Sequence, residues 1–305
     1  MQFKYRERDR GKDLINSGFF DGDLGGGKFM GKEYAFVLKD GLLNLYVDIR
    51  DEVLEYFKQN KIVWWAGNYP TGHVSSSQIA CLNHLFTIRH EKEAVLNLLR
   101  TVSDDFIDVF PIKENLEGYI QFEAVGGDIN LLNEGKNIRG RNCTSIDALI
   151  YAQHRDGRRV LIPIEWKYVE LYGNADKSTE EGGNTRKARY LDLIKNSRYL
   201  NANTLACCWF EPFYQLMRQT LWAEQLLKHQ PVGFEADDYL HLHVIPADNA
   251  ELLDKIYPCS NKDMETTWKD CLTDPDKYII ISPQQFWSKQ LIDTDIYNYL
   301  SRRYW

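Results

Sequence analysis

The chain has 305 residues, of which 44% are hydrophobic and 27% are charged. This is the composition of a folded globular protein, and it excludes a largely disordered one. The net charge of −7 argues against a protein that coats nucleic acid over its whole surface, although local basic segments can still bind phosphates.

Nothing in the sequence indicates export or a membrane partner. The first ten residues are basic but no apolar segment follows them, and no stretch approaches the roughly 18 apolar residues that a transmembrane helix needs. Six cysteines are present, none in a C-x-x-C pair: Cys81, Cys143, Cys207, Cys208, Cys259 and Cys271. We therefore expect a cytoplasmic protein whose thiols are reduced.

Residues 1–35 are rich in glycine and charge and are expected to form a turn-rich lead-in. The segment from Gly22 to Lys28 matches G-x-x-x-x-G-K, but Phe29 stands where a phosphate loop needs Ser or Thr, so we reject that motif. Residues 51–60 have helical spacing, and the serines at 75–77 can cap a long helix that reaches about Arg100.

The middle of the chain predicts helix, three strands, helix, strand, helix, strand. The predicted strands are 119–125, 145–154, 160–169, 202–210 and 240–245, and the predicted helices are 186–199 and 212–229. We divide the chain into an N-terminal extension (1–74), a core (75–246) and a mixed or helical C-terminal cap (247–305), packed as one compact unit.

Charged side chains interrupt two of the apolar predicted strands. Glu165 and Lys167 are two residues apart, so they point to the same face of their strand. A buried carboxylate and ammonium are costly unless they are paired, bind a metal or face a cleft. Asp147 lies in the preceding strand and joins them only if the hairpin register allows it.

The turn between these strands decides the register. A two-residue turn at Asp156 and Gly157 would place Asp147 opposite Trp166. A three-residue loop over 155–157, with Gly157 in the left-handed conformation, would place Asp147 opposite Glu165, and we favour this second geometry. Pro163 cannot donate to a strand ladder, so we expect it to mark a bulge before Glu165.

Asp147 followed by Glu165-Trp166-Lys167 resembles the D…(D/E)-x-K signature of the PD-(D/E)XK nuclease superfamily, which includes many restriction endonucleases. The element order over roughly residues 75–210 also resembles its core. Residues 76–78, 144–147, 165–168 and 214–219 further resemble a bacterial restriction-endonuclease-like group. The proline that usually precedes the aspartate is replaced by Ile146. The resemblance implies an α/β fold with an αβββαβ core, a mixed β-sheet flanked by helices.

The resemblance also implies a nuclease that depends on Mg²⁺, for which Mn²⁺ can substitute, and that acts on phosphodiester bonds, most often in DNA. Asp147 and Glu165 would bind the metal, and Lys167 would orient the attacking water or stabilise the negative charge that develops. The main-chain carbonyl of Trp166 would be a further ligand, and so would one more carboxylate, for which Glu123 is the first candidate and Glu91 and Glu93 are alternatives.

Other residues would support the site. Gln78 and Glu170 would lie behind the ligands. Basic residues flank the signature in sequence and could contact phosphates, or could simply be solvated: Arg139, Arg141, Arg186, Lys187 and Arg189. Many enzymes of this type cut both strands as dimers, so a homodimer is an expectation.

Three alternatives stay open from the sequence. Glu165 and Lys167 could be a buried ion pair with Asp147 capping a turn. The fold could serve a nucleic-acid or partner-binding module without turnover, as the acidic net charge suggests. The substrate could be RNA or a repair or recombination intermediate. His241 and His243 could share a metal, but we expect them to be ordinary strand residues.

Overall fold

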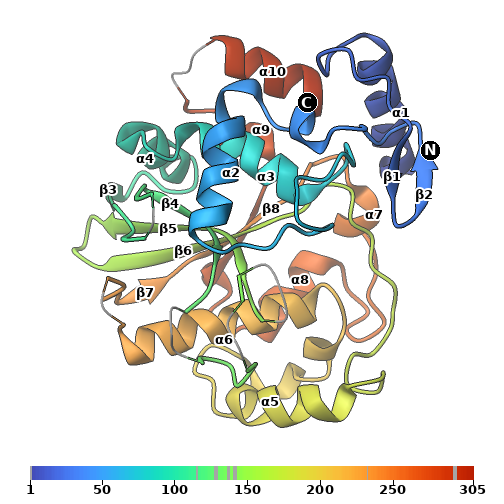
Figure 1. The fold of residues 1–305 in the computed structure, drawn as a ribbon. Helices are drawn as coiled ribbons and strands as arrows, with labels where there is room; N and C mark the ends of the chain where they lie inside the picture. The colour runs from blue at the N-terminus through green and yellow to red at the C-terminus, as the bar shows by residue number, and fades with distance from the viewer. Residues whose placement is uncertain are drawn as a thin grey trace.

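A seven-stranded mixed sheet lies between two layers of helices in the computed structural model (Figure 1). The structure describes residues 2–114, 116–126, 130–135, 138–139, 143–231, 233–290 and 294–305. The strands of the sheet are β3 (Phe106–Phe110), β4 (Ile120–Ala124), β5 (Ile146–His154), β6 (Arg159–Trp166), β7 (Asp238–Tyr239), β8 (His241–Val244) and β9 (Tyr278–Ile281).

The sheet is antiparallel on one side of β6 and parallel on the other. Its order is β3-β5-β6-β8-β9, with β4 also beside β5 and β7 also beside β6. β3, β4 and β6 run antiparallel to β5, whereas β7 and β8 run parallel to β6, and β9 runs parallel to β8. The mixed sheet flanked by helices confirms the predicted fold class.

Each face of the sheet carries its own hydrophobic core, because successive strand residues point to opposite faces. Ala148, Ile150 and Ile164 belong to the first core, and Leu149 and Leu161 belong to the second. The first core is covered by α2 (Arg50–Gln59), α3 (Ser77–Leu85), α4 (Lys92–Arg100), α9 (Pro283–Phe286) and α10 (Thr294–Tyr304). The second is covered by α5 (Gly183–Lys195), α6 (Phe213–His229), α7 (Ala250–Leu253) and α8 (Met264–Cys271).

Several predicted elements are confirmed, namely the three strands 119–125, 145–154 and 160–169, the helices α2, α5 and α6, and strand β8. The predicted strand 202–210 is wrong. It consists of two 3₁₀ turns, Ala202–Thr204 and Cys207–Trp209, so the strand that continues the sheet comes only after α6. The predicted long helix is also wrong as one piece, because a 3₁₀ turn at Phe86–Ile88 separates α3 from α4.

The N-terminal segment contains a helix that the sequence prediction missed. α1 (Phe3–Asn16) precedes a small hairpin formed by β1 (Gly27–Phe29) and β2 (Lys32–Tyr34). The buried residues of α1 recur at helical spacing, but they include Glu7 and Gly11. Gly11 is needed because a Cβ there would lie 2.4 Å from a methyl carbon of Val74.

The three segments that the sequence analysis separated contribute to common cores. The first core contains Phe3 and Val53 of the N-terminal segment, Ile150 of the central one, and Phe286 and Leu300 of the C-terminal one. The C-terminal segment also adds β9 to the sheet edge. Figure 1 shows the N-terminal mark beside α1 and the C-terminal mark at α10, and Arg10 of α1 donates to the main-chain oxygens of Ser301 and Trp305.

The cysteines differ from the expectation of six reduced thiols. Cys207 and Cys259 form a disulfide with their Cα atoms 5.3 Å apart, so the prediction is wrong for this pair. Cys81, Cys143, Cys208 and Cys271 are free.

Within the part of the chain that the structure describes, no helix combines the length and the apolar character needed to cross a membrane.

Candidate active site

Asp147, Glu165 and Lys167 line one cleft of about 720 Å³. The cleft opens where β5 begins and β6 ends, and its walls come from α1, the β1–β2 hairpin, the start of α3, and α6. The structure therefore brings together the three residues that the sequence singled out, although they come from two strands and the segment that follows β6.

The hairpin between β5 and β6 has the three-residue loop that we predicted. Gln153 pairs with Arg159, and the loop residue Gly157 has φ +91°. The pairing continues without a break to Ala148 and Ile164, so the next residues along the two strands are Asp147 and Glu165. The predicted bulge at Pro163 is wrong, because Pro163 pairs in register with Leu149. Pro163 has no N–H to donate, and on its other side it lies where the pairing of β6 passes from β7 to β8 and no ladder pair is formed.

Glu165 is almost fully buried and is surrounded by hydrogen-bond donors. Lys167 and Gln219 each donate to one of its carboxylate oxygens. Gln215 donates to Oε1 of Glu165 at 2.7 Å and accepts a hydrogen bond from Lys167 at 2.8 Å. Burial is the largest single effect and would lower the pKa of Lys167, but the interactions with Glu165, Tyr172, Glu170 and Asp147 together outweigh it and raise the pKa well above its ordinary value. This lysine is therefore positively charged at neutral pH.

The pKa values of Asp147 and Glu123 are also raised, which for an acid favours the uncharged form. Burial, and then repulsion from Glu165, raise the pKa of Asp147 well above its usual range, although its Oδ2 accepts a hydrogen bond from the Trp166 N–H at 2.8 Å. Burial raises the pKa of Glu123 to about 7, against the effect of a 2.7 Å hydrogen bond from Gln78. Several carboxylates that repel one another in a buried cleft indicate a place for positive charge.

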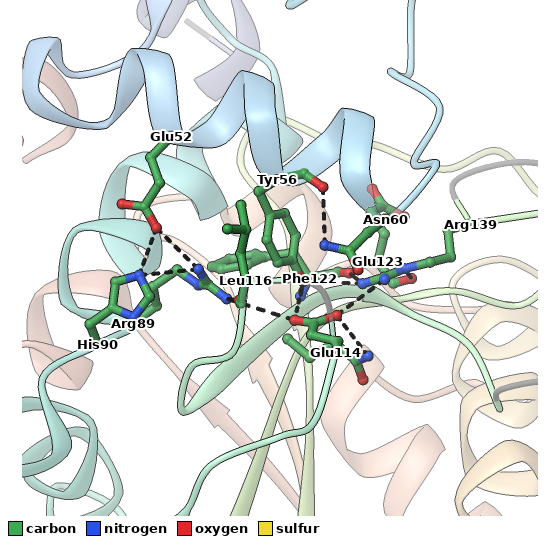
Figure 2. A network of polar contacts seen from close by, with 11 residues as sticks. Glu52, Tyr56, Asn60, Arg89, His90, Glu114, Leu116, Phe122, Glu123 and Arg139 are labelled. Atoms are coloured by element: carbon green, nitrogen blue, oxygen red, sulfur yellow. Dashed lines mark hydrogen bonds and ion pairs between the residues drawn. The ribbon is translucent and has the colours of Figure 1, made fainter.

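Glu123 also has an unusual backbone. Its φ is +48°, in the left-handed region that non-glycine residues rarely adopt. Arg139 holds this turn: it donates to the main-chain oxygens of Phe122 and Glu123, the latter at 3.0 Å, and its guanidinium also bonds to Glu114 and to the Tyr56 hydroxyl, each at 3.1 Å. Figure 2 shows Arg139 lying between Glu123 and Glu114 in this network.

The predicted nucleic-acid contacts are not among the residues that line the cleft. The side chain of Arg139 is only 12% exposed and is occupied by the network just described. Arg186 donates to the main-chain oxygens of Lys177 and Glu181, and so anchors the loop before α5. Lys187 and Arg189 lie on α5 away from the cleft lining. Arg141 lies outside the described residues. Contact of any of these residues with nucleic acid stays a prediction.

The two residues expected behind the ligands do lie at the cleft. Gln78 lies in the first turn of α3, accepts a 3.3 Å hydrogen bond from the main-chain N–H of Trp65 and donates to Glu123. Glu170 accepts a 2.6 Å hydrogen bond from the Tyr168 N–H and adds to the negative charge near Lys167.

Other cleft residues were missed by the sequence analysis. Gln215 and Gln219 are four residues apart, so they share one face of α6, and both donate to Glu165. The resemblance over residues 214–219 was a usable signal for them. Lys4, Arg8 and Trp65 line the opposite wall. No spacing in the sequence could connect them to a site about 80 or more residues further along, because only the tertiary fold brings α1 there.

The chemistry of the donor set fits a divalent metal ion that prefers oxygen ligands. Glu123, Asp147 and Glu165 supply carboxylate oxygens, and the raised pKa values of the first two would be relieved by a cation. Among the described residues, however, no three His, Cys, Asp or Glu side chains are grouped closely enough to hold a metal ion as they stand. Glu165 would have to exchange some of its present hydrogen bonds for metal coordination.

Comparison with known proteins places the chain in a family. No match was found among curated proteins, and none among solved structures. One family model matches residues 15–305, nearly the whole chain, and its description is restriction endonuclease associating with ARP. The match includes the β5–β6 hairpin and α6, which contribute residues to the cleft, and leaves out residues 1–14, which hold most of α1. The chain therefore belongs to this restriction-endonuclease family.

Proposed function

We propose that the protein is a metal-dependent nuclease of the PD-(D/E)XK type that hydrolyses phosphodiester bonds in DNA. The observation that carries the proposal is the convergence of Asp147, Glu165 and Lys167 on one cleft in a chain of a restriction-endonuclease family. The expected cytoplasmic location and homodimer stay predictions.

In this proposal Asp147 and Glu165 hold Mg²⁺ or Mn²⁺, with Glu123 and the carbonyl of Trp166 as further ligands. When bound, the ion supplies an acidified water and offsets negative charge at the scissile phosphate. Lys167 stays protonated and directs its ammonium group at the attacking water or at the negative charge that develops on the phosphate. Gln215, which contacts both Lys167 and Glu165, orients the pair.

A cleavage assay tests the assignment. Supercoiled plasmid, linear duplex and single-stranded DNA are incubated with the chain and Mg²⁺ or Mn²⁺. Asp147→Asn and Lys167→Met should each lower the rate by about 100-fold or more, because each removes a charge that the reaction needs. Asp192→Asn and Lys195→Met, on the exposed face of α5, are the matched controls and should cleave normally. Full activity in Asp147→Asn or in Lys167→Met would refute the roles given to them.

A second candidate function is a binding module without turnover. The observation that favours it is the state of Glu165, which is already neutralised by Lys167 and by two glutamine amides. Calorimetry with Mg²⁺ separates the two functions. Tight binding of DNA, with neither metal uptake nor cleavage of DNA, RNA or branched repair intermediates, would favour the module.

A further inference from the structure

The wall of the cleft that faces the carboxylates is built by the N-terminal part of the chain. It carries Lys4 and Arg8 of α1, Phe29 and Met30 of the β1–β2 hairpin, and Trp65. These residues combine positive charge with exposed apolar surface, whereas the opposite wall holds the acids. The established family assignment gives this wall no role.

Lys4 and Arg8 are the cations of this wall. They are four residues apart and so share one face of α1. Neighbouring Arg6, Arg10 and Lys12 all form ion pairs with carboxylates, but within the described residues Lys4 and Arg8 form none.

Two observations place these charges in a position to meet an anion. The guanidinium carbon of Arg8 lies 4.7 Å from the centre of the Phe36 ring, and its Nε is buried without a hydrogen-bond partner among the described residues. Burial, and then the charges of Arg8 and Lys4, lower the pKa of the neighbouring His73 to about 4. Positive charge therefore accumulates here, with no ion pair to either side chain in the part of the chain that the structure describes.

Trp65 supplies a flat apolar surface beside these cations. Its side chain is unusually open for a tryptophan, with 61% exposure, and Met30 is 87% exposed. The indole is nevertheless held in place, because it stacks on Phe29 with ring centres 5.3 Å apart and planes at 24°. The main-chain N–H of Trp65 donates to Gln78, which in turn donates to Glu123, so the backbone that carries the indole is tied to the acids of the cleft.

We propose that this wall binds an unstacked nucleotide of the substrate strand, with Trp65 stacking on its base and Lys4 and Arg8 contacting the adjoining phosphates. This inference rests on the proposed nuclease function and specifies its substrate as a nucleic acid with an unpaired or extruded nucleotide at the cleavage site. Stacking on an aromatic ring is open to any base, so the wall selects strand state rather than sequence. The cleft volume of about 720 Å³ falls in the range of pockets that enclose a small molecule, which suits a short length of one strand and not a duplex.

Binding is measured by fluorescence anisotropy with the full chain in EDTA, so that cleavage does not interfere. The probes are a single-stranded oligonucleotide, the perfect duplex, and the same duplex with one unpaired nucleotide. The single strand and the interrupted duplex should bind at least about tenfold more tightly than the perfect duplex. Trp65→Ala should weaken their binding at least about fivefold, which is the lower end of the stacking contribution of one base.

The two cations are tested by their salt dependence. Lys4→Gln/Arg8→Gln should reduce the slope of log Kd against log salt concentration by roughly 1.4, the value for two lost contacts to a single strand. Lys12→Gln/Lys32→Gln removes the same charge from residues that do not line the cleft, and should leave the slope unchanged. Trp65→Phe should restore most of the affinity lost in Trp65→Ala, and Tyr69→Ala, which removes an exposed ring of the same loop outside the cleft lining, should have no effect.

The outcomes separate this inference from the nuclease proposal. Equal binding of all three probes, no binding of any probe, or unchanged affinity in both Trp65→Ala and Lys4→Gln/Arg8→Gln overturns the inference. A wild-type chain that cleaves DNA alongside any of those results keeps the nuclease proposal. Selective binding that depends on Trp65, with no cleavage under any metal condition, supports the inference and rejects the nuclease proposal.

Discussion

At the scale of single residues, the site pairs one buried acid with a lysine and leaves two acids without an ion pair among the described residues. Glu165 is paired with Lys167 and two amides, whereas Asp147 and Glu123 have raised pKa values in the same cleft. The contrast arises because α6 supplies two amide donors to Glu165, whereas Glu123 receives one amide hydrogen bond from Gln78 and Asp147 one main-chain hydrogen bond from Trp166. Buried acids with raised pKa values beside a protonated lysine are typical of catalytic sites.

The buried pair gives a stability prediction. Lys167→Met leaves Glu165 buried without its cation and should lower the free energy of unfolding by about 3 kcal/mol. Glu165→Gln/Lys167→Met removes both charges and should recover more than half of that loss. Urea unfolding at pH 7 measures both. Lys177→Met is the control, because its pair with Glu180 is partly exposed and worth only about 0.5 kcal/mol. A double variant as unstable as Lys167→Met would contradict this account.

At the scale of secondary-structure elements, the β5–β6 hairpin sets the geometry of the site. Its three-residue loop fixes the pairing, and a shift of one residue would turn Asp147 away from Glu165. Gly157 makes this loop possible because it adopts φ +91°.

Gly157→Ala should therefore destabilise the protein by about 1 kcal/mol, because the added Cβ meets no neighbour but the left-handed backbone disfavours it. Gly157→Asn should be milder, since asparagine tolerates that conformation. Gly173→Ala is the control: this glycine is also in open space and has no positive φ, so the change should be neutral or slightly stabilising. Thermal unfolding compares the three, and equal effects of Gly157→Ala and Gly173→Ala would refute the argument.

The sequence could predict this hairpin because turn chemistry and alternating strand residues are local signals. It could not distinguish a buried strand from buried 3₁₀ turns at Cys207–Trp209, since a short apolar run fits both. It also missed α1, because Glu7 and Gly11 interrupt the apolar stripe. Glu7 is buried there because it accepts a 2.7 Å hydrogen bond from Tyr168, a partner 161 residues away. The basic wall of the cleft was missed because it too depends on contacts between distant parts of the chain.

At the scale of the whole molecule, several histidines are buried in neutral form. Burial is the main cause that lowers the pKa of His73 to about 4, and of His84 and His241 to about 3. In the unfolded chain a histidine titrates near 6.5, so between these values the unfolded state binds more protons. The stabilisation is therefore complete above about pH 6.5 and is lost as the pH falls toward the folded-state values.

Each of these histidines should contribute about 1.4 kcal/mol per pH unit to the fall in unfolding free energy below pH 6. His84→Gln should reduce the measured slope by about that amount between pH 6 and 4.5. His229→Gln, at the exposed end of α6, should leave the slope unchanged. Glu123, with its raised pKa, makes the unfolding free energy rise as the pH falls over this range, but it does so equally in the wild type and in both variants. Identical slopes for His84→Gln and the wild type would show that His84 is not the neutral buried group described.

The hairpin that unites Asp147 and Glu165 also has a consequence for the order in which the site assembles. Asp147 and Trp166 are bonded across 19 residues, whereas Gln219 reaches Glu165 across 54. Shorter loops close sooner, so the acids should meet in the folding transition state before α6 brings its amides. Asp147→Asn should then accelerate refolding, because it removes the repulsion from Glu165 that is already present in the transition state. Gln219→Leu should chiefly accelerate unfolding, because its hydrogen bond forms later. Stopped-flow kinetics in urea measure the two rates. Slower refolding in Gln219→Leu, with only the unfolding rate changed in Asp147→Asn, would mean that α6 docks before the hairpin brings the acids together.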